Sequence, residues 1–492
     1  MRFLATIFAD AAGGAERPTT IALLALVVGL QAADIGTVGA LAVPLKDSLH
    51  INNTQVGLLV TVSAGVGALA TLVAGTLADR MPLGRPMLAG LALFAVGLVV
   101  GGTAPDMPVL VAGRAVQGLG AGAVPAAAYV AISRGYPEAC RPRMFAVLST
   151  AWVVPGLIGP AIASLVATAA GWRWVFLGLL PLVIPAGVLV VLALKHVPSP
   201  ARASNAAVPY LPVLGVVAGA VLALASVSSG DLFAGAGGVI AGGSLLAVSL
   251  RRLTPPGTLI AGRGLPATIL SRGLLTCCFF AGDAYVPYAI VAVRHSPTAL
   301  AALALTASTM TWTAGSWVQA RYITRFGPRR LVRSGQCLVL GGLALMCLAL
   351  VPSVPSGLGI LAWAVAGAGI GLAYAPLSVT TLDRAAAGEE GRATSGLQLC
   401  DVLGQAVGTG VAGAIVAGAA GVLGHRPAVA LAFSFGIVIA VTALAVGARL
   451  PDRLIGPEAN RMLSLAFRLT AASFPISLAA TASSSLTVGS WP

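Results

Sequence analysis

The stretch "VLVAGRAVQGLGAGAVPAAAYVAISRG", residues 109–135, holds an arginine within an apolar run. Apart from Arg114 and Gln117, its first 24 residues are apolar or small. A helix of about 20 such residues crosses the ~30 Å hydrocarbon core of a bilayer. A charge near the bilayer centre costs roughly 2.5–3.5 kcal/mol on insertion scales, so a charge that is kept there is a functional candidate. The stretch therefore predicts a transmembrane helix that carries a functional arginine.

The composition of the whole chain is that of an integral membrane protein. Only 9% of the 492 residues are charged and 58% are hydrophobic, which leaves too little charge to cover a soluble domain. The 61 glycines fit this class, because small residues let transmembrane helices approach closely. The six cysteines show no metal-ligand spacing, so we interpret them as small buried hydrophobic residues.

Apolar segments of about 20 residues occur fourteen times and fall into groups of six, two and six. They cover 19–42, 54–78, 87–104, 107–133, 144–168, 173–194, 209–227, 232–250, 267–292, 298–320, 334–351, 357–382, 394–421 and 428–448. The predicted fold is an all-α polytopic membrane protein with two six-helix bundles and two extra central helices. The expected domains are a cytoplasmic N-terminus at 1–18, a first bundle at 19–194, a linker with the two added helices at 195–266, a second bundle at 267–448, and a cytoplasmic tail at 449–492.

The distribution of basic residues sets the expected orientation. With a cytoplasmic N-terminus, the inner loops and tails carry 24 of the 29 Lys and Arg. The outer loops carry four, namely Lys46, Arg173, Arg294 and Arg426, and Arg114 is the remaining one. This asymmetry follows the positive-inside rule, so both termini are expected in the cytoplasm of a multi-pass protein of the cell membrane. The rule also accounts for the net charge of +14 without nucleic-acid binding.

Four charged residues are expected inside the membrane. Asp34, Arg114 and Asp283 lie ~12, ~10 and ~13 Å from the outer surface, given the rise of a helix per residue. Asp401 lies ~10 Å from the cytoplasmic side. Because the first three share one level, they are candidates for a pair or a proton relay.

An arginine disfavours protonation of a carboxylate beside it, and its withdrawal favours proton uptake. Such a pair can therefore couple proton flow to a conformational change. Two alternatives stay open at this point. The pair could be a static salt bridge between two helices, or Arg114 could extend its side chain to the outer interface. Asp401 could likewise reach the inner interface.

Three other stretches carry recognisable patterns. They are "DIGTVGALAVP" at 34–44, "GTLADRMPLGRP" at 75–86 and "VVPGLIGPAIAS" at 153–164. Together with 114–122 they resemble motifs of the major facilitator superfamily, and the chain looks most like its fourteen-span drug:proton antiporters of the EmrB/QacA type. The resemblance covers roughly residues 19–448. It implies alternating access of a central path to the two sides of the membrane.

The resemblance assigns roles to individual residues. It places Arg114 in the proton-coupling machinery, and Asp34 is the preferred partner. It implies a conformational latch between the bundles, formed by Gly75, Asp79, Arg80, Gly84 and Arg85, the last two after an insertion of two residues. It also implies an antiporter motif in the fifth span at Pro155, Gly156, Gly159 and Pro160.

The chain departs from the family pattern at three places. Ala163 and Ser164 replace the final glycine pair of the antiporter motif, which weakens the prediction of antiport. In the second half, Thr324 occupies the position of the latch acid. An acidic residue such as Asp401 is unusual in the thirteenth span of the family, so the number of protonation sites stays open.

The expected substrate path has few polar groups among apolar walls. The candidates are Gln31, Asp34, Gln117, Asp283, Tyr285, Tyr288, Trp312, Trp317 and Gln319. Aromatic walls with one or two carboxylates suit amphipathic or cationic organic molecules. The alternative for each single aromatic residue is ordinary packing between helices.

These observations predict a secondary active transporter, a proton-coupled antiporter that exports hydrophobic or cationic organic compounds. The alternative is a lipid or metabolite transporter of the same superfamily, including a symporter. A membrane-embedded enzyme is not expected, because the chain has four His and no metal or nucleophile signature. The absence of a P-loop argues against ATP as the driving force. We expect no cofactor, no metal and no nucleic acid. The expected partners are a small organic substrate, protons and the lipid bilayer, and the expected oligomeric state is a monomer.

Overall fold

The computed structural model describes residues 17–49, 53–137, 140–197, 210–227, 232–386 and 389–454, and over these residues all regular secondary structure is helical. A helix lies at each of the fourteen places where a span is expected. The expected N-terminal segment up to residue 16 and the tail beyond 454 lie outside the described residues.

The first half of the chain forms α2 to α9. The bounds are α2 Arg17–Ala40, α3 Ala42–Leu49, α4 Asn53–Ala78, α5 Gly84–Gly102, α6 Met107–Gly135, α7 Arg141–Ala170, α8 Arg173–Leu177 and α9 Leu180–Ala193, followed by the 3₁₀ turn η1 Leu194–His196. The short helix α3 was not predicted, because the residues between the first two expected spans were interpreted as a loop. Pro181 breaks the expected span 173–194, since its ring conflicts with the carbonyl of Leu177, where α8 ends.

The second half begins with the central pair α10 and α11. The bounds are α10 Tyr210–Val227, α11 Leu232–Leu253, η2 Thr258–Ile260, α12 Leu265–Asp283, α13 Val286–Tyr288, the π-helix η3 Ala289–Val293, α14 Thr298–Ala349, α15 Leu358–Arg384, α16 Glu390–Leu423 and α17 His425–Gly447. The expected span 267–292 is interrupted where α12 ends at Asp283. Pro287 lies four residues later and cannot donate a hydrogen bond to the Asp283 carbonyl, which accounts for the break.

The helix α14 joins two expected spans in 52 residues without a separate loop. Its single non-helical residue is Gly327, at φ 76° and ψ 161°, and Pro328 restarts the helix. A positive φ favours glycine, because a Cβ atom would be strained there. The turn packs against the end of the described chain, where Arg329 donates to the Leu450 carbonyl at 2.9 Å and to Asp452 Oδ1 at 2.6 Å.

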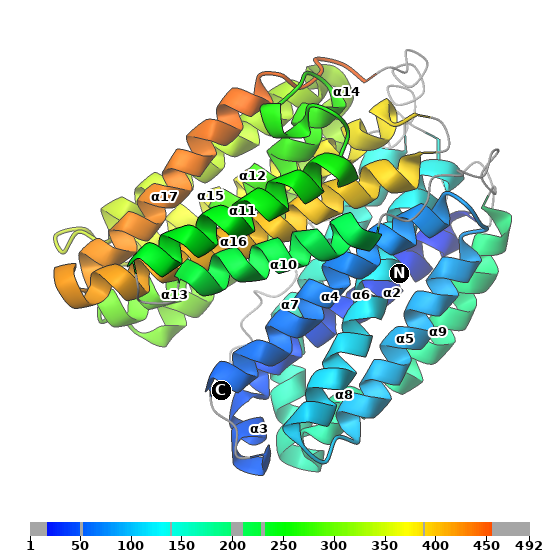
Figure 1. The fold of residues 1–492 in the computed structure, drawn as a ribbon, viewed down its shortest axis with the longest axis horizontal. Coiled ribbons are helices and arrows are strands. Elements are labelled where there is room, and N and C mark those ends of the chain that lie inside the picture. Colours follow the sequence, from blue (N-terminus) through cyan, green and yellow to red (C-terminus); the bar gives the residue numbers. More distant parts are fainter. Residues whose placement is uncertain are drawn as a thin grey trace, which may run out of the picture.

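Two bundles make up the molecule (Figure 1). One large hydrophobic core lies mainly among α2 to α9, and a second lies among α12 to α17. We call the end that carries the turn Asp79–Leu83 the latch end. The bundles lie close together there and diverge toward α3 and α13 (Figure 1). Near the latch end, Ser395 of α16 donates to the Thr71 carbonyl of α4 at 3.0 Å.

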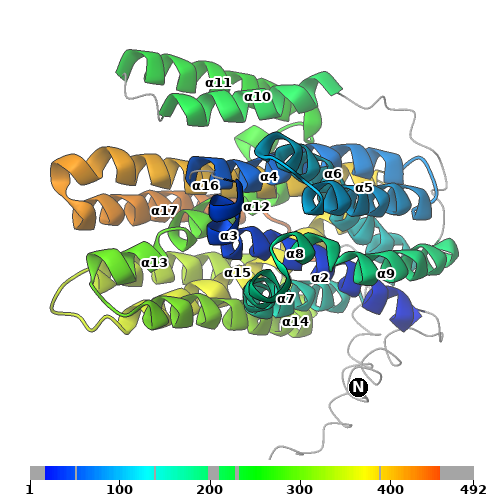
Figure 2. The same cartoon turned by 90° about the horizontal axis from the view of Figure 1, so that it is seen from below.

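The central pair α10 and α11 stands apart from both bundles (Figure 2). Val216 of α10 and Leu253 of α11 form a small apolar cluster with Leu399 of α16, and α10 also touches α4. The pair therefore adds to the outside of the molecule beside one helix of each bundle, and the two bundles keep their direct contact with each other.

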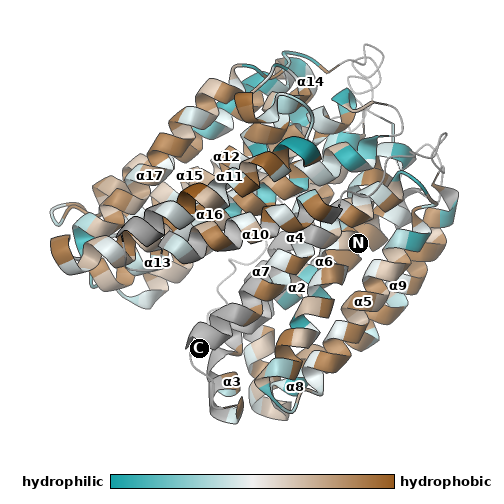
Figure 3. Ribbon diagram, in the orientation of Figure 1, coloured by the Kyte–Doolittle hydropathy of each residue, from teal (hydrophilic) through white to brown (hydrophobic). Residues whose placement is uncertain are grey.

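Hydrophobic residues predominate along the helices, and many of the polar residues lie near the helix ends and connections (Figure 3). Large hydrophobic side chains such as Leu165, Leu211 and Val438 are exposed, at 68%, 81% and 62%. Among the described residues, eight helices are long and apolar enough to cross a membrane, and one of them is α14. The helix faces that carry these exposed hydrophobic side chains are suited to lipid contact. The count of fourteen crossings stays a prediction.

The helices α4 and α6 pack at the distance that glycine permits. A Cβ atom at Gly122 would overlap the Gly67 backbone, and one at Gly118 would overlap Ser63. Thr71 donates one hydrogen bond to the Gly67 carbonyl at 2.9 Å and another to the Gly122 carbonyl at 3.0 Å. The glycines that follow Arg114 thus fix how closely its helix approaches α4, in the manner of small-residue contacts between membrane helices.

This packing predicts that Gly122→Ala destabilises the protein by about 1–3 kcal/mol, the usual effect of overpacking a tight contact. Gly65→Ala is the matched control, because a Cβ atom at Gly65 meets no heavy atom within 4 Å. Thermal unfolding in detergent, followed by size-exclusion, measures the difference. Equal unfolding temperatures for the two variants would contradict the close contact between α4 and α6.

Candidate functional site

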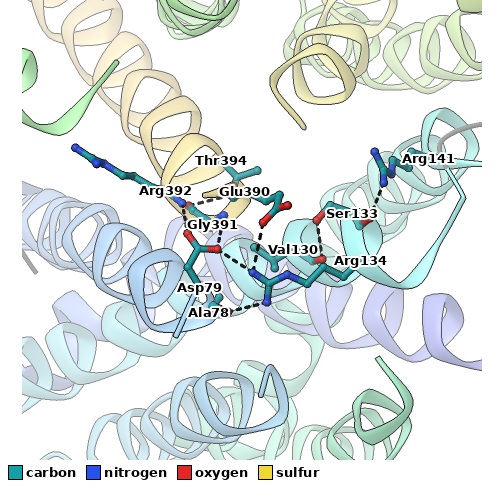
Figure 4. Close-up of polar contacts among 10 residues, drawn as sticks. All are labelled: Ala78, Asp79, Val130, Ser133, Arg134, Arg141, Glu390, Gly391, Arg392 and Thr394. Carbon is teal, nitrogen blue, oxygen red and sulfur yellow. Dashed lines mark hydrogen bonds and ion pairs between the residues drawn. The ribbon is translucent and has the colours of Figure 1, made fainter. Parts of the chain in front are cut away.

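A carboxylate at the latch end connects the two bundles. Asp79 directly follows α4, and its Oδ1 and Oδ2 accept hydrogen bonds from the backbone N–H groups of Gly391 and Arg392, each at 2.8 Å (Figure 4). These N–H groups belong to the first turn of α16, where helical amides have no partner within the helix and the helix dipole is positive. Glycine at 391 is required, because a Cβ atom would collide with Gly75 and Asp79.

An arginine from α6 completes this latch. Arg134 Nη2 lies 2.9 Å from Asp79 Oδ1 and 3.6 Å from Glu390 Oε2, and Arg134 Nη1 donates to the Ala78 carbonyl at 2.8 Å (Figure 4). A positive group thus lies between one acid from each bundle. Neither Arg134 nor Glu390 is among the residues predicted for the site: Arg134 was counted only with the basic residues of the inner loops, and nothing in the sequence singled out Glu390.

The other residues of the predicted latch have different places. Gly75 contacts α16, where a Cβ atom would collide with Ser395. Gly84 begins α5, and Arg85 is exposed. Arg80 lies in the turn after α4. Among the contacts of the described residues, the positive charge beside Asp79 is that of Arg134.

Burial raises the pKa of Asp79 from 3.8 to about 6. The backbone hydrogen bonds from Gly391 and Arg392 and the charge of Arg134 oppose this rise, while Glu390 adds to it. A carboxylate that is exposed to water has the ordinary value. Breaking the contact between the bundles would therefore lower the pKa of Asp79.

The first bundle holds a buried ion pair. Arg114 Nη1 donates to Asp34 Oδ2 at 2.8 Å and to Gln117 Oε1 at 2.7 Å. Arg114 and Asp34 are each 2% exposed, so both charges are removed from solvent. Gln31 lies three residues before Asp34 on α2 and donates to the Gly120 carbonyl of α6 at 3.3 Å. The structure thus brings together Gln31, Asp34, Arg114 and Gln117, from α2 and α6, and Arg114 points inward.

The predicted antiporter motif lies on α7, beside the helix that carries Asp34. A Cβ atom at Gly29 of α2 would lie 3.0 Å from the Ala151 carbonyl and 3.7 Å from Pro155. One at Gly159 would lie 3.7 Å from the carbonyl oxygen of Ala33, the neighbour of Asp34. Gly156 and Pro160 lie on the same helix. Small residues therefore let α7 and α2 pack closely beside the ion pair.

Asp283 lies in the other bundle, so the three charges of one predicted level do not form one cluster. Its carboxylate accepts a hydrogen bond from Trp363 Nε1 at 2.8 Å. Trp363 stacks on Phe279 with ring centroids 5.2 Å apart, and Phe279 contacts Trp312 at 5.5 Å. Asp283 thus adjoins an aromatic cluster that includes Trp312, one of the predicted path residues.

The remaining predicted path residues lie apart from this cluster. Tyr285 and Tyr288 pack against the second core beyond the end of α12, and the Tyr288 hydroxyl lies 2.6 Å from His425 Nδ1 at the exposed end of the bundle. Trp317 Nε1 donates to Thr150 Oγ1 of the first bundle at 3.1 Å. Gln319 Nε2 lies 3.4 Å from the Pro142 carbonyl. Trp317 and Gln319 thus contribute to the contact between the bundles.

A second buried ion pair corrects the count of intramembrane charges. Arg272 lies five residues inside the expected span 267–292, although the sequence analysis counted it with the inner loops. It is fully buried in α12, and its Nε lies 2.8 Å from Asp401 Oδ1. The Tyr374 hydroxyl donates to Asp401 Oδ2 at 2.7 Å. Asp401 is therefore held within the second bundle and does not extend to the inner interface.

Comparison with known proteins gives consistent results. The family model described as Major Facilitator Superfamily matches residues 24–409. The chain is 27% identical over 365 residues to a "probable multidrug-efflux transporter" of Mycobacterium tuberculosis H37Rv, covering 70% of this chain and 77% of that one. It is 25% identical over 420 residues to the methylenomycin A resistance protein of Streptomyces coelicolor, covering 82% and 87%. The fold is similar to that of the human organic anion transporter MFSD10 (TETRAN), with a TM-score of 0.61, 15% identity, and coverage of 87% and 98%.

The geometry of the latch predicts a pH dependence. Because the closed contact raises the pKa of Asp79 to about 6, the closed state binds a proton more tightly than a state in which Asp79 meets water. Closure is therefore most favoured below pH ~4, and this advantage is lost as the pH rises through ~6. The distance between spin labels at the exposed positions 82 and 386, with the exposed Cys337 replaced by serine, measures the closed fraction.

Asp79→Asn should remove the dependence in this window, since an amide does not titrate there. Asp452→Asn is the matched control, because that carboxylate pairs with Arg329 outside the latch. A wild-type distance distribution that is constant between pH 4 and 7 would show that Asp79 does not link proton binding to closure.

Proposed function

The chain belongs to the major facilitator superfamily, and on this basis we propose that it is a proton-coupled exporter of hydrophobic or cationic organic compounds. It is a multi-span membrane transporter and not an enzyme. Relatives named for multidrug efflux and for antibiotic resistance support export as the direction of transport. The assignment to the fourteen-span antiporters is part of the proposal.

The buried pair of Arg114 and Asp34 is the observation that carries the proposal of proton coupling. An ion pair that is 2% exposed on both sides costs several kcal/mol of desolvation per ion, and its attraction offsets this only with good geometry. An arginine does not release its proton under these conditions. The carboxylate is therefore the group that can exchange a proton, when a conformational change or a substrate withdraws the guanidinium.

The latch supplies the conformational change in this proposal. We assign the latch end to the cytoplasmic side, as the basic residues predict. The bundles meet there through Asp79 and the start of α16, so this conformation corresponds to a path that is closed toward the cytoplasm. Rocking of the bundles would break these contacts and open the path on that side.

Asp283 is our candidate for recognition of a cationic group. Its carboxylate is held by one hydrogen bond from Trp363, and aromatic rings lie beside it. A carboxylate that is flanked by aromatic faces attracts organic cations by charge and by cation–π contact. The proton gradient is the proposed driving force, with no cofactor, and a single chain would contain the whole path.

Purified protein in proteoliposomes with a pH-sensitive dye inside tests the function. A panel of cationic, neutral and lipid-like compounds is added under an imposed proton gradient. Proton movement opposite to substrate supports the exporter, and movement in the same direction would establish a symporter. No proton movement, combined with transfer of labelled lipid, would replace the proposal with lipid transport.

Asp34→Asn should reduce substrate-driven proton movement to the background of empty liposomes, because an amide keeps the size of the side chain but carries no exchangeable acidic proton. Asp34→Glu should retain measurable coupling. Size-exclusion and the unfolding temperature show whether both variants fold. Full coupling in the folded Asp34→Asn variant would remove Asp34 from the mechanism.

Asp283→Asn should lose transport of cationic compounds and keep transport of neutral ones, because only the cations need the negative charge. Tyr288→Phe is a suitable control, since its hydroxyl bonds to His425 at the exposed end of the bundle. Equal losses for both classes of compound would instead indicate a role of Asp283 in coupling or stability.

A further inference from the structure

The surroundings of Arg272 have the features of a binding site. Arg272 is 0% exposed, and its Cζ lies 3.0 Å from the centroid of the Tyr374 ring. Its Nε bonds to Asp401 Oδ1 at 2.8 Å, and its Nη1 donates to the Tyr374 carbonyl at 2.6 Å and to Ser378 Oγ at 3.3 Å. One guanidinium is thus held by a carboxylate, an aromatic face, a carbonyl and a hydroxyl.

This set of partners is one that proteins use for organic cations. A carboxylate supplies charge-assisted hydrogen bonds, and an aromatic face supplies a cation–π contact that strengthens when water is excluded. The Tyr374 hydroxyl donates to the other oxygen of Asp401, so the carboxylate and the ring are fixed relative to each other. A ligand with a guanidinium or alkylammonium group would find all of its partners in place if Arg272 were absent.

We propose that Asp401 and Tyr374 form a recognition site for an organic cation and that Arg272 is a tethered cation that occupies this site in the present conformation. The guanidinium meets the carboxylate through Nε and the ring through its flat face, which are the two contacts that a free organic cation would make.

The site lies at the contact between the bundles. Tyr129 of α6 faces Arg272 and Ser378 from the first bundle. A separation of the bundles at the latch end would withdraw Tyr129 and uncover Arg272. The latch end is assigned to the cytoplasmic side, from which an exported compound enters. This step rests on the proposed function, whereas the cation site itself does not.

Aromatic side chains connect the site with Asp283. Tyr374 contacts Trp312 at 5.5 Å between ring centroids, Trp312 contacts Phe279 at 5.5 Å, and Phe279 stacks on Trp363, the partner of Asp283. A carboxylate therefore lies at each end of one continuous series of rings. The rings between the two carboxylates are packed core side chains, and Phe279 and Trp363 are 2% and 0% exposed.

Removal of the tethered cation tests the site. Arg272→Ala should bind methylguanidinium, which would raise the unfolding temperature of the purified variant by about 2 °C at roughly tenfold excess over its Kd. The same concentration of sodium chloride is the ionic control. Wild-type protein, whose site is filled, should show no such rise.

Two further variants separate the site from general effects of the salt. Arg272→Ala combined with Asp401→Asn should lose the response, since the carboxylate is gone. Arg114→Ala is the control, because it removes the other arginine buried among the described residues and leaves the Asp401 site filled by Arg272; adding Asp401→Asn to it should not change its response to methylguanidinium. Should Arg272→Ala not yield folded protein, Arg272→Gln decides the question with methylammonium as the probe, because the glutamine amide can still donate to the Tyr374 carbonyl.

Identical responses of wild type and the Arg272 variant, or a response that survives Asp401→Asn, would overturn the proposal and leave Arg272 as a structural link between helices. Because the measurement uses binding alone, its result is independent of the direction of transport and of proton coupling. A negative transport assay in proteoliposomes would therefore not test whether the cation site exists.

Discussion

One carboxylate at the first turn of a helix joins the two bundles at the latch end. Asp79 receives two amides from α16 and one guanidinium nitrogen from α6, and so three separate segments meet at one side chain. The amides belong to a helix terminus, where they have no partner within the helix. Each partner of Asp79 is thus a group that would otherwise need water, and the contact can exchange with water at little cost. Such an interaction suits a joint that closes and opens repeatedly.

The two buried ion pairs have a different character. Arg114 with Asp34, and Arg272 with Asp401, each lie within one bundle, so rocking of the bundles does not need to break them. For Arg272, rocking would change its access instead, because Tyr129 of the other bundle lies against it. The molecule thus combines a contact between bundles that breaks with charged groups inside each bundle that become accessible. In the proposed transport cycle, opening of the contact between the bundles controls access to the buried charges.

Much of the fold follows from local features of the sequence. Apolar runs predicted the places of the helices, because a backbone in lipid must satisfy its own hydrogen bonds. The depth of Asp34 and Arg114 indicated a pair, since both lie in long apolar segments. Arg272 was assigned to a loop because it lies near the end of its segment, where arginine is common. Its partner is 129 residues away, and only the packing of α12 on α16 brings the two together.

The latch shows the same limit. A motif marked Asp79, yet its partners Arg134 and Gly391 lie 55 and 312 residues away along the chain. Neither has a local signal that distinguishes it from a basic or small residue of an ordinary loop. The breaks at Pro181 and Pro287 were readable in principle, because proline removes a specific hydrogen bond. They were missed because the average hydropathy of those segments stays high on both sides of the break.

The single-residue turn at Gly327 has a consequence for how the chain can be shortened. Its backbone is covered by Asp452, and Arg329 is held by Leu450 and Asp452. The residues after α17 therefore complete the second bundle, although they follow its last helix. A truncation after Gly447 would expose this turn to water and remove the contacts that hold the two halves of α14 at Gly327. The second bundle accordingly extends along the chain at least as far as Asp452.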